Sequence, residues 1–232
     1  MILCLETATS VCSVALADRN GIISERQSSE PRSHATILTV FIEELLGEQN
    51  IKASSLEAVV VSKGPGSYTG LRIGVSVAKG ISYAAGIPLV GVDTTLSLFN
   101  GVFNKIQKEY SGKNPVYCPM IDARRMEVFY CLFDSTGKVI REVTAEVIAA
   151  DTFSFIEETR PVIIFGDGAV KCPGVINRQN LVHVEGITPR AGNMREAAYQ
   201  ALDAGRAEDL AYFEPFYLKD FVATIPRKNI MA

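Results

Sequence analysis

The sequence predicts an α/β protein built on a mixed β-sheet, and three observations lead to this fold class. Short apolar runs separated by turn residues open the chain, which is the pattern of antiparallel hairpins. Apolar residues then recur at helical spacing over residues 33–46 and 68–85. Short buried runs follow each helix, over residues 56–61 and 88–92. This alternation is typical of a sheet whose faces are covered by helices.

The composition is ordinary for a globular protein and narrows the functional classes. Of the 232 residues, 47% are hydrophobic and 21% are charged, and the net charge is −3. A negative chain argues against an autonomous nucleic-acid binder, which would normally carry a basic surface. Without a signal-peptide pattern or an apolar run of about 18 residues, we expect a cytoplasmic protein with no membrane contact. Five cysteines without a CxxC pair indicate reduced, buried thiols.

Three antiparallel strands are expected first, over residues 1–5, 11–17 and 22–28. The first turn is rich in Thr and Ser, and the Asn-Gly pair at Asn20 makes the second turn. One acid, Glu6, lies at the tip of the first hairpin. In an ATPase fold an acid at this place can hold a magnesium–phosphate complex, but we favour a solvated turn acid.

The helix expected over residues 33–46 has a wide apolar face and ends at Gly47. Its apolar residues form two adjacent lines: Ile37, Phe41 and Leu45, and beside them Leu38, Ile42 and Leu46. A surface helix needs only one such stripe to pack on its sheet. The extra width therefore indicates a second contact.

A glycine-rich loop, residues 64–66, leads into a helix that Ser67 is expected to cap and Gly86 to end. Small residues recur at every fourth position of this helix: Gly70, Gly74, Ala78 and Ser82. Each glycine in a helix interior costs about 1 kcal/mol. The stripe therefore indicates the close approach of another backbone.

The glycine-rich loop does not match the known phosphate-binding patterns. Its third glycine, Gly70, comes one residue too late for the dinucleotide fingerprint. Leu71 stands where a P-loop would need Lys followed by Ser or Thr. A helix N-terminus can hold a phosphate, but we favour a structural turn.

We predict that the two helices together form a surface for a partner protein. The alternative is that each helix only packs on its own sheet. The predicted interface residues are Ile37, Phe41, Leu45, Gly70, Leu71, Gly74, Ala78 and Ser82. On this interpretation, leucine at Gly74 would abolish partner binding and leave the monomer folded.

We expect a second unit to begin after a helix over 94–103 and a polar stretch over 104–114, and to repeat the plan of the first. Its expected elements are strands over 116–121, 127–133, 138–147, 162–165 and 181–184, a short helix capped by Asp151, and a helix over 193–204. We therefore expect an N-terminal lobe (1–104), a C-terminal lobe (105–212) and a tail (213–232) that packs back on the N-terminal lobe.

The residues offer little for catalysis. Neither His34 nor His183 has a His, Asp or Glu four residues later, as a helical metal site would need. No GxSxG motif is present. The acids Asp122 and Asp167 lie in the second unit. We predict no catalytic residue and no metal site.

Three segments together closely resemble the TsaB (YeaZ) family: LETAT at 5–9, GPGSYTGLRIG at 64–74 and AKGISYAAGIPLVGV at 78–92. The resemblance is looser at DARRMEVFY, 122–130, and at EPFYLKDF, 214–221. It implies a two-lobe actin-like ATPase (ASKHA) fold, in which each lobe is a mixed sheet with flanking helices.

The resemblance implies a non-catalytic subunit of the tRNA threonylcarbamoyladenosine transferase complex. Such a subunit supports its catalytic paralogue TsaD in modifying the adenosine beside the anticodon of ANN-decoding tRNAs, together with the ATPase TsaE. Pairing is implied through the two helices named above, and homodimers in isolation through the same face. The lone chain is expected to hold no cofactor, and a nucleotide at the interface with TsaD is compatible with the resemblance.

The resemblance also bears on a metal site. TsaD-like chains carry an NHxxxH motif after the PLVGV strand, and its histidines bind the metal. Here Thr94 and Leu98 occupy those places, and neither can replace imidazole as a ligand. The main alternative is a stand-alone ATP-dependent enzyme of the same fold, such as a small kinase, which ATP hydrolysis by the lone chain would reveal. A peptidase is disfavoured, since no nucleophile or metal site is evident.

Overall fold

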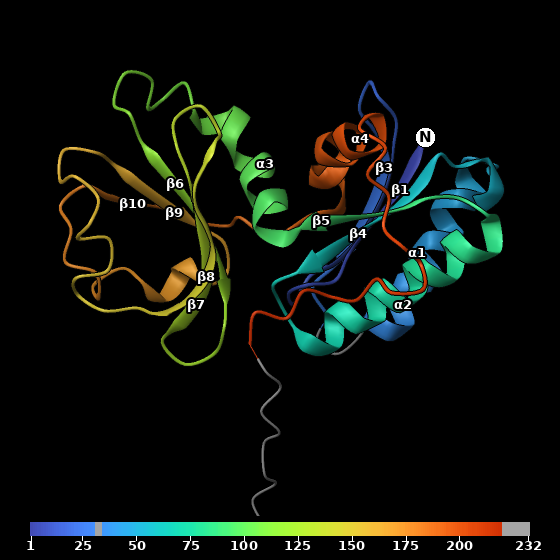
Figure 1. Cartoon of the computed structure of the whole chain (residues 1–232), viewed down its shortest axis with the longest axis horizontal. Coiled ribbons are helices and arrows are strands. Elements are labelled where there is room, and N and C mark those ends of the chain that lie inside the picture. The colour runs from blue at the N-terminus through green and yellow to red at the C-terminus, as the bar shows by residue number, and fades with distance from the viewer. Residues whose placement is uncertain (31–33, 220–232) are drawn as a thin grey trace, which may run out of the picture.

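The computed structural model describes residues 1–30 and 34–219, which form two lobes, each built on a five-stranded sheet (Figure 1). The first sheet contains β1 (Ile2–Glu6), β2 (Cys12–Ala17), β3 (Ile22–Ser28), β4 (Ala58–Gly64) and β5 (Leu89–Asp93). The second contains β6 (Val116–Asp122), β7 (Glu127–Phe133), β8 (Val139–Val147), β9 (Val162–Phe165) and β10 (Leu181–Val184). The predicted two-lobe, actin-like α/β fold with a mixed sheet in each lobe is confirmed.

The two sheets share one topology. The orders are β3-β2-β1-β4-β5 and β10-β9-β6-β7-β8, so each lobe has its first strand at the centre. In both sheets the first three strands are antiparallel, and the last two are parallel to the first. The repeated plan inferred from the order of elements is therefore correct at the level of strand topology.

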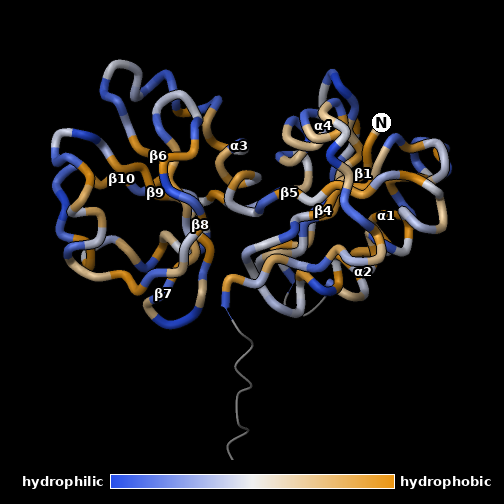
Figure 2. The backbone as a smooth tube through the Cα atoms, in the orientation of Figure 1, coloured by the Kyte–Doolittle hydropathy of each residue, from blue (hydrophilic) through white to orange (hydrophobic). Residues whose placement is uncertain are grey.

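Helices cover both faces of the first sheet (Figure 1). On one face lie α1 (His34–Glu48) and α2 (Tyr68–Ala85), and they pack on Leu3 and Leu5 of β1. On the other lies α4 (Arg195–Asp203), preceded by a short 3-10 helix, and it packs on Ile2 and Cys4. Because side chains alternate along a strand, β1 is buried on both faces. Figure 2 shows β6 and β9 as mainly hydrophobic, β8 as more hydrophilic, and many outer loops as hydrophilic.

The second sheet is covered differently. One face packs on α3 (Thr94–Ile106), through Phe99 and Val102. The other is covered by turns, which contribute Phe153 and Ile156 to its core, and by one short 3-10 segment, Ala169–Lys171. The short helix predicted after Asp151 is wrong, because residues 149–159 form turns. Phe153 has φ 72°, a left-handed conformation that cannot continue a helix.

The C-terminal part of the chain returns to the first lobe. Residues 191–203 pack on the first sheet, although the sequence assigned them to the second lobe, because an apolar helix face does not specify which sheet it covers. Beyond them, Phe213 is buried in the first core and the Phe216 N–H donates to the Lys63 carbonyl, 2.7 Å away. Residues 220–232 of the predicted tail, and Ser33 of the first predicted helix, lie outside the described residues.

Two further expectations concern the thiols and the membrane. All five cysteines are buried and free, as predicted. Within residues 1–30 and 34–219, no helix combines the length and the apolar character needed to cross a bilayer.

Candidate functional site

The structure contains both caps that were predicted for α2, Ser67 at its start and Gly86 at its end. The Ser67 hydroxyl oxygen accepts a hydrogen bond from the Gly70 N–H at 3.3 Å, which satisfies a free donor in the first turn. At the other end Gly86 has φ 68°, the left-handed conformation that glycine adopts without strain. Both caps fix where α2 begins and ends.

The stripe of small residues on α2 faces the protein's own first sheet. A side chain at Gly70 would collide with the carbonyl oxygen of Thr7, and one at Gly74 with the Thr7 hydroxyl. Ala78 and Ser82 are fully buried. The glycines therefore let α2 lie directly against the end of β1, a contact within the chain that accounts for the stripe.

This arrangement corrects the predicted interface. Six of the eight predicted residues are buried inside the first lobe and offer a partner no surface in this conformation: Leu45, Gly70, Leu71, Gly74, Ala78 and Ser82. Ile37 and Phe41 are the two that keep exposed surface. A leucine side chain at Gly74 would also strike the Thr7 hydroxyl, so Gly74→Leu strains the monomer itself and does not isolate partner binding.

Apolar surface remains on the outer side of the same two helices, which contact each other. We call it the α1–α2 face, and it consists of Ile37, Val40 and Phe41 on α1 and Ile73, Val77 and Ile81 on α2. Val40 is 45% exposed and the others are half-buried. Val40 and the three α2 members were not among the predicted interface residues, although the i, i+4 spacing of the α2 members beside the small stripe was a usable signal.

Glu6 is enclosed in the first lobe, which overturns its interpretation as a solvated turn acid. The side chain is fully buried. Its Oε1 accepts from the Ala8 N–H at 2.7 Å and from the Ser62 hydroxyl at 2.8 Å, while Oε2 has no partner among the described residues. Burial raises the pKa of this carboxyl from 4.5 to about 7, against these hydrogen bonds, which lower it. The group can therefore hold a proton near neutral pH.

In the second lobe Asp122, at the end of β6, lies next to Asp167, which follows β9, and a cation accompanies them. The Asp167 carboxylate accepts from the Asp122 N–H at 3.1 Å. The Lys171 ammonium donates to the Asp122 carboxylate and, at 2.7 Å, to the Glu127 carbonyl. Burial raises the pKa of Asp167 above its usual value. Asp122 therefore already has a cation partner within the chain.

The remaining candidates for catalysis lie apart from one another. The His34 Nε2 lies 2.9 Å from the Thr9 carbonyl oxygen, so this side chain holds the first hairpin loop. His183 lies on β10 in the other lobe. Thr94 and Leu98 are fully buried on α3. Among the residues that the structure describes, no three metal-binding side chains cluster.

Comparison with known proteins gives one family. Residues 15–158 match the family model described as TsaD: tRNA N6-adenosine threonylcarbamoyltransferase. The chain is 28% identical to the tRNA threonylcarbamoyladenosine biosynthesis protein TsaB of Escherichia coli, over 96% of each chain. It is 30% identical to TsaB of Bacillus subtilis, over 71% of this chain and 70% of the relative. The solved structure of YeaZ from Pseudomonas aeruginosa superposes with a TM-score of 0.76 at 23% identity, over 94% of this chain and 99% of that one.

Proposed function

Because the chain belongs to the TsaB (YeaZ) family of tRNA threonylcarbamoyladenosine biosynthesis proteins, we propose that it is a non-catalytic subunit of the transferase complex. In this role it binds the catalytic paralogue TsaD and works with the ATPase TsaE in the cytoplasm. The complex modifies the adenosine beside the anticodon of ANN-decoding tRNAs.

The α1–α2 face is the observation that carries this proposal. Six apolar side chains on two adjacent helices keep surface exposed after the core of the first lobe is complete. Contiguous apolar surface of this kind marks protein–protein contacts. Burying it against TsaD would fix the relative position of the two subunits and hold TsaD in its active arrangement.

The positions of the acids support a non-catalytic role. Glu6 is enclosed and Asp122 is paired with Lys171, so neither carboxylate is free to hold a magnesium–phosphate complex in this conformation. A stand-alone ATP-dependent enzyme is the second candidate, and the shared fold favours it. ATP hydrolysis by the lone chain, measured against the chain with TsaD and TsaE added, separates the two.

The interface is tested by placing a charge on the α1–α2 face. Val40→Asp buries an unpaired carboxylate in the complex and should weaken TsaD binding about 100-fold. Val170→Asp is the matched control, because Val170 is 69% exposed on the second lobe, and it should leave binding unchanged. Titration calorimetry of each variant with TsaD measures both constants.

The same variants test self-association. If the lone chain forms a homodimer through this face, Val40→Asp should yield a monomer in sedimentation experiments while Val170→Asp remains dimeric. Equal TsaD affinity for the two variants would contradict the assignment of the interface to α1 and α2.

A further inference from the structure

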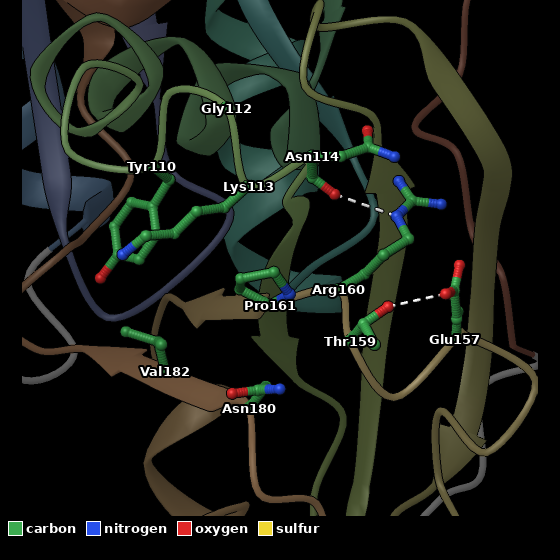
Figure 3. A pocket seen from close by; sticks show the side chains of 10 residues that line it. All are labelled: Tyr110, Gly112, Lys113, Asn114, Glu157, Thr159, Arg160, Pro161, Asn180 and Val182. Carbon is green, nitrogen blue, oxygen red and sulfur yellow. Dashed lines mark hydrogen bonds between the residues drawn. The ribbon is translucent and has the colours of Figure 1, made fainter.

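An open hollow of about 560 Å³ lies on the second lobe, away from the α1–α2 face (Figure 3). Three segments form it: the loop after α3, the turn before β9 and the start of β10. Its principal side chains are Tyr110, Lys113, Asn114, Arg160, Asn180 and Val182. Neither the partner contact nor the acids described above use these residues.

The hollow is positively charged, although the chain as a whole is negative. Lys113 and Arg160 line it, and neither has a carboxylate partner among the described residues. Its one lining acid, Glu157, accepts a hydrogen bond from the Thr159 hydroxyl at 2.7 Å and pairs with neither cation, so the lining keeps an excess of one positive charge. Both cations therefore remain available to an anionic ligand.

Arg160 is held in place by the opposite loop. Its Nε–H donates to the Asn114 carbonyl at 3.0 Å, and Asn114 has φ 48°. That bond uses one of the five guanidinium N–H groups and leaves the terminal nitrogens without a recorded protein acceptor in the described chain. The guanidinium is thus oriented before any ligand arrives.

Tyr110 supplies an aromatic surface beside the cations. Its ring is half-buried against the core that α3 shares with the second sheet. The Lys113 ammonium lies over the face of this ring, 5.5 Å from its centroid, so a base that packs on this face displaces the ammonium toward the phosphate. Figure 3 shows Tyr110 and Lys113 next to each other on one side of the hollow and Arg160 on the other.

We propose that this hollow binds an unstacked nucleotide of the tRNA substrate. The base packs on Tyr110, and the phosphate lies between Lys113 and Arg160. Proteins recognise single-stranded RNA by this combination of an aromatic platform and backbone-binding cations. The Asn114 Oδ1 accepts from the Ser135 hydroxyl at 3.3 Å, and the Asn180 Nδ2 donates to the Glu158 carbonyl at 2.8 Å. The Asn114 amide nitrogen and the Asn180 amide oxygen therefore remain for a base edge. The inference rests on the proposed role in tRNA modification.

The openness of the hollow favours RNA over a free mononucleotide. Lys113, Asn114 and Asn180 are exposed, so the cations stand at a rim along which a polynucleotide backbone can pass. A site for a free small ligand would enclose most of the ligand's surface.

The test is binding of an unmodified tRNA transcript to the full chain, alone and in complex with TsaD, at about 100 mM salt. Lys113→Glu should weaken binding about tenfold and flatten the salt dependence, because a phosphate contact is lost. Tyr110→Leu should weaken binding by a similar factor with an unchanged salt slope, because stacking alone is lost. Lys52→Glu, the same charge change on an exposed residue of the first lobe, should bind like the wild type.

TsaD binding and tRNA binding are measured separately, so a failure of the proposed function can be distinguished from a failure of the RNA site. Failure of the chain to bind TsaD contradicts the proposed function. In that case, tRNA binding by the lone chain and its variants tests the hollow. Equal tRNA affinity for Lys113→Glu and Lys52→Glu, in protein with a wild-type melting temperature, overturns the hollow alone. Saturation by free AMP, with tRNA affinity unaffected by Lys113→Glu, also overturns it and identifies a mononucleotide site.

Discussion

The two lobes use the same sheet and cover it in different ways. In the first lobe the connections between β3 and β4 and between β4 and β5 contain the helices α1 and α2. In the second lobe the equivalent connections, around β9, consist of turns and one 3-10 segment. Helices add a second, outward apolar face, whereas turns leave a polar surface with a charged hollow. Strand topology therefore sets the framework, and the connections set what each lobe can bind.

Turns need hydrogen-bond donors that helices supply for themselves. Arg178, which is buried, provides them in the second lobe. Its two terminal nitrogens donate to the carbonyl oxygens of Phe153 at 3.3 Å, Ile156 at 2.9 Å, Glu157 at 2.6 Å and Arg160 at 2.8 Å. One side chain thus holds the connection from β8 to β9 in place.

Removing Arg178 should lower the stability of the protein more than any other substitution proposed for the two lobes. Arg178→Leu removes a donor from four carbonyl groups, of which those of Phe153 and Glu157 keep a backbone N–H donor. We expect a loss of about 3–5 kcal/mol in the free energy of unfolding. Arg206→Leu, at an exposed arginine, is the control and should change stability by about 0.5 kcal/mol or less. Urea denaturation measures both. A wild-type urea midpoint for Arg178→Leu would show that the turns between β8 and β9 are stable without the Arg178 hydrogen bonds.

The two hairpin tips differ in charge, and Glu6→Gln tests that difference. The folded state keeps the Glu6 proton up to about pH 7, whereas the unfolded state releases it near 4.5. Since the native state binds more protons in this window, wild-type stability falls as pH rises through it. Glutamine cannot titrate, so the stability of the variant relative to the wild type should rise by about 3 kcal/mol between the two ends of the window.

Glu43→Gln, at an exposed glutamate of α1, is the control for this titration. The pH dependence assigned to Glu6 is the part of the Glu6→Gln curve that the Glu43→Gln curve does not share. Parallel curves for Glu6→Gln and the wild type would mean that Glu6 titrates normally in the folded state, and the two tips would then be alike.

Substitutions of the α2 glycines should have the smallest effect on stability, and here the control lies on the same helix. Gly74→Ala places a methyl group against the Thr7 hydroxyl, so we expect a loss of about 1–3 kcal/mol. Gly80→Ala meets nothing within 4 Å on the same helix, and it should stabilise by up to about 1 kcal/mol. Thermal unfolding of the two variants should therefore shift in opposite directions. A shift in the same direction would contradict the close approach of α2 to β1.

The strands and caps could be predicted because local chemistry determines them. Alternating apolar runs and turn residues located β3, β7, β9 and β10, and the Ser67 and Gly86 caps bounded α2. Whether the stripe of small residues on α2 faces the protein's own sheet or a partner could not be predicted. A backbone approaching from within the chain and one approaching from a partner require the same small residues.

The burial of side chains at the ends of strands, such as Glu6, could not be predicted from the sequence either. Glu6 is enclosed because α2 and β4 meet over the hairpin tip, a tertiary arrangement with no signal in the residues nearby. The hollow on the second lobe joins residues 110–114, 157–161 and 180–182, which no sequence motif connects. Chemistry within one element was predictable, and chemistry assembled from several elements was not.

Reconstituted tRNA modification tests the central claim most directly. TsaD, TsaE and the threonylcarbamoyl donor are incubated with an ANN-decoding tRNA, with and without this chain, and the modified adenosine is quantified. The account predicts modification only when the chain is present, none by the chain alone, and loss with Val40→Asp but not with Val170→Asp. Equal modification in the absence of the chain, or modification by the chain alone, would contradict it.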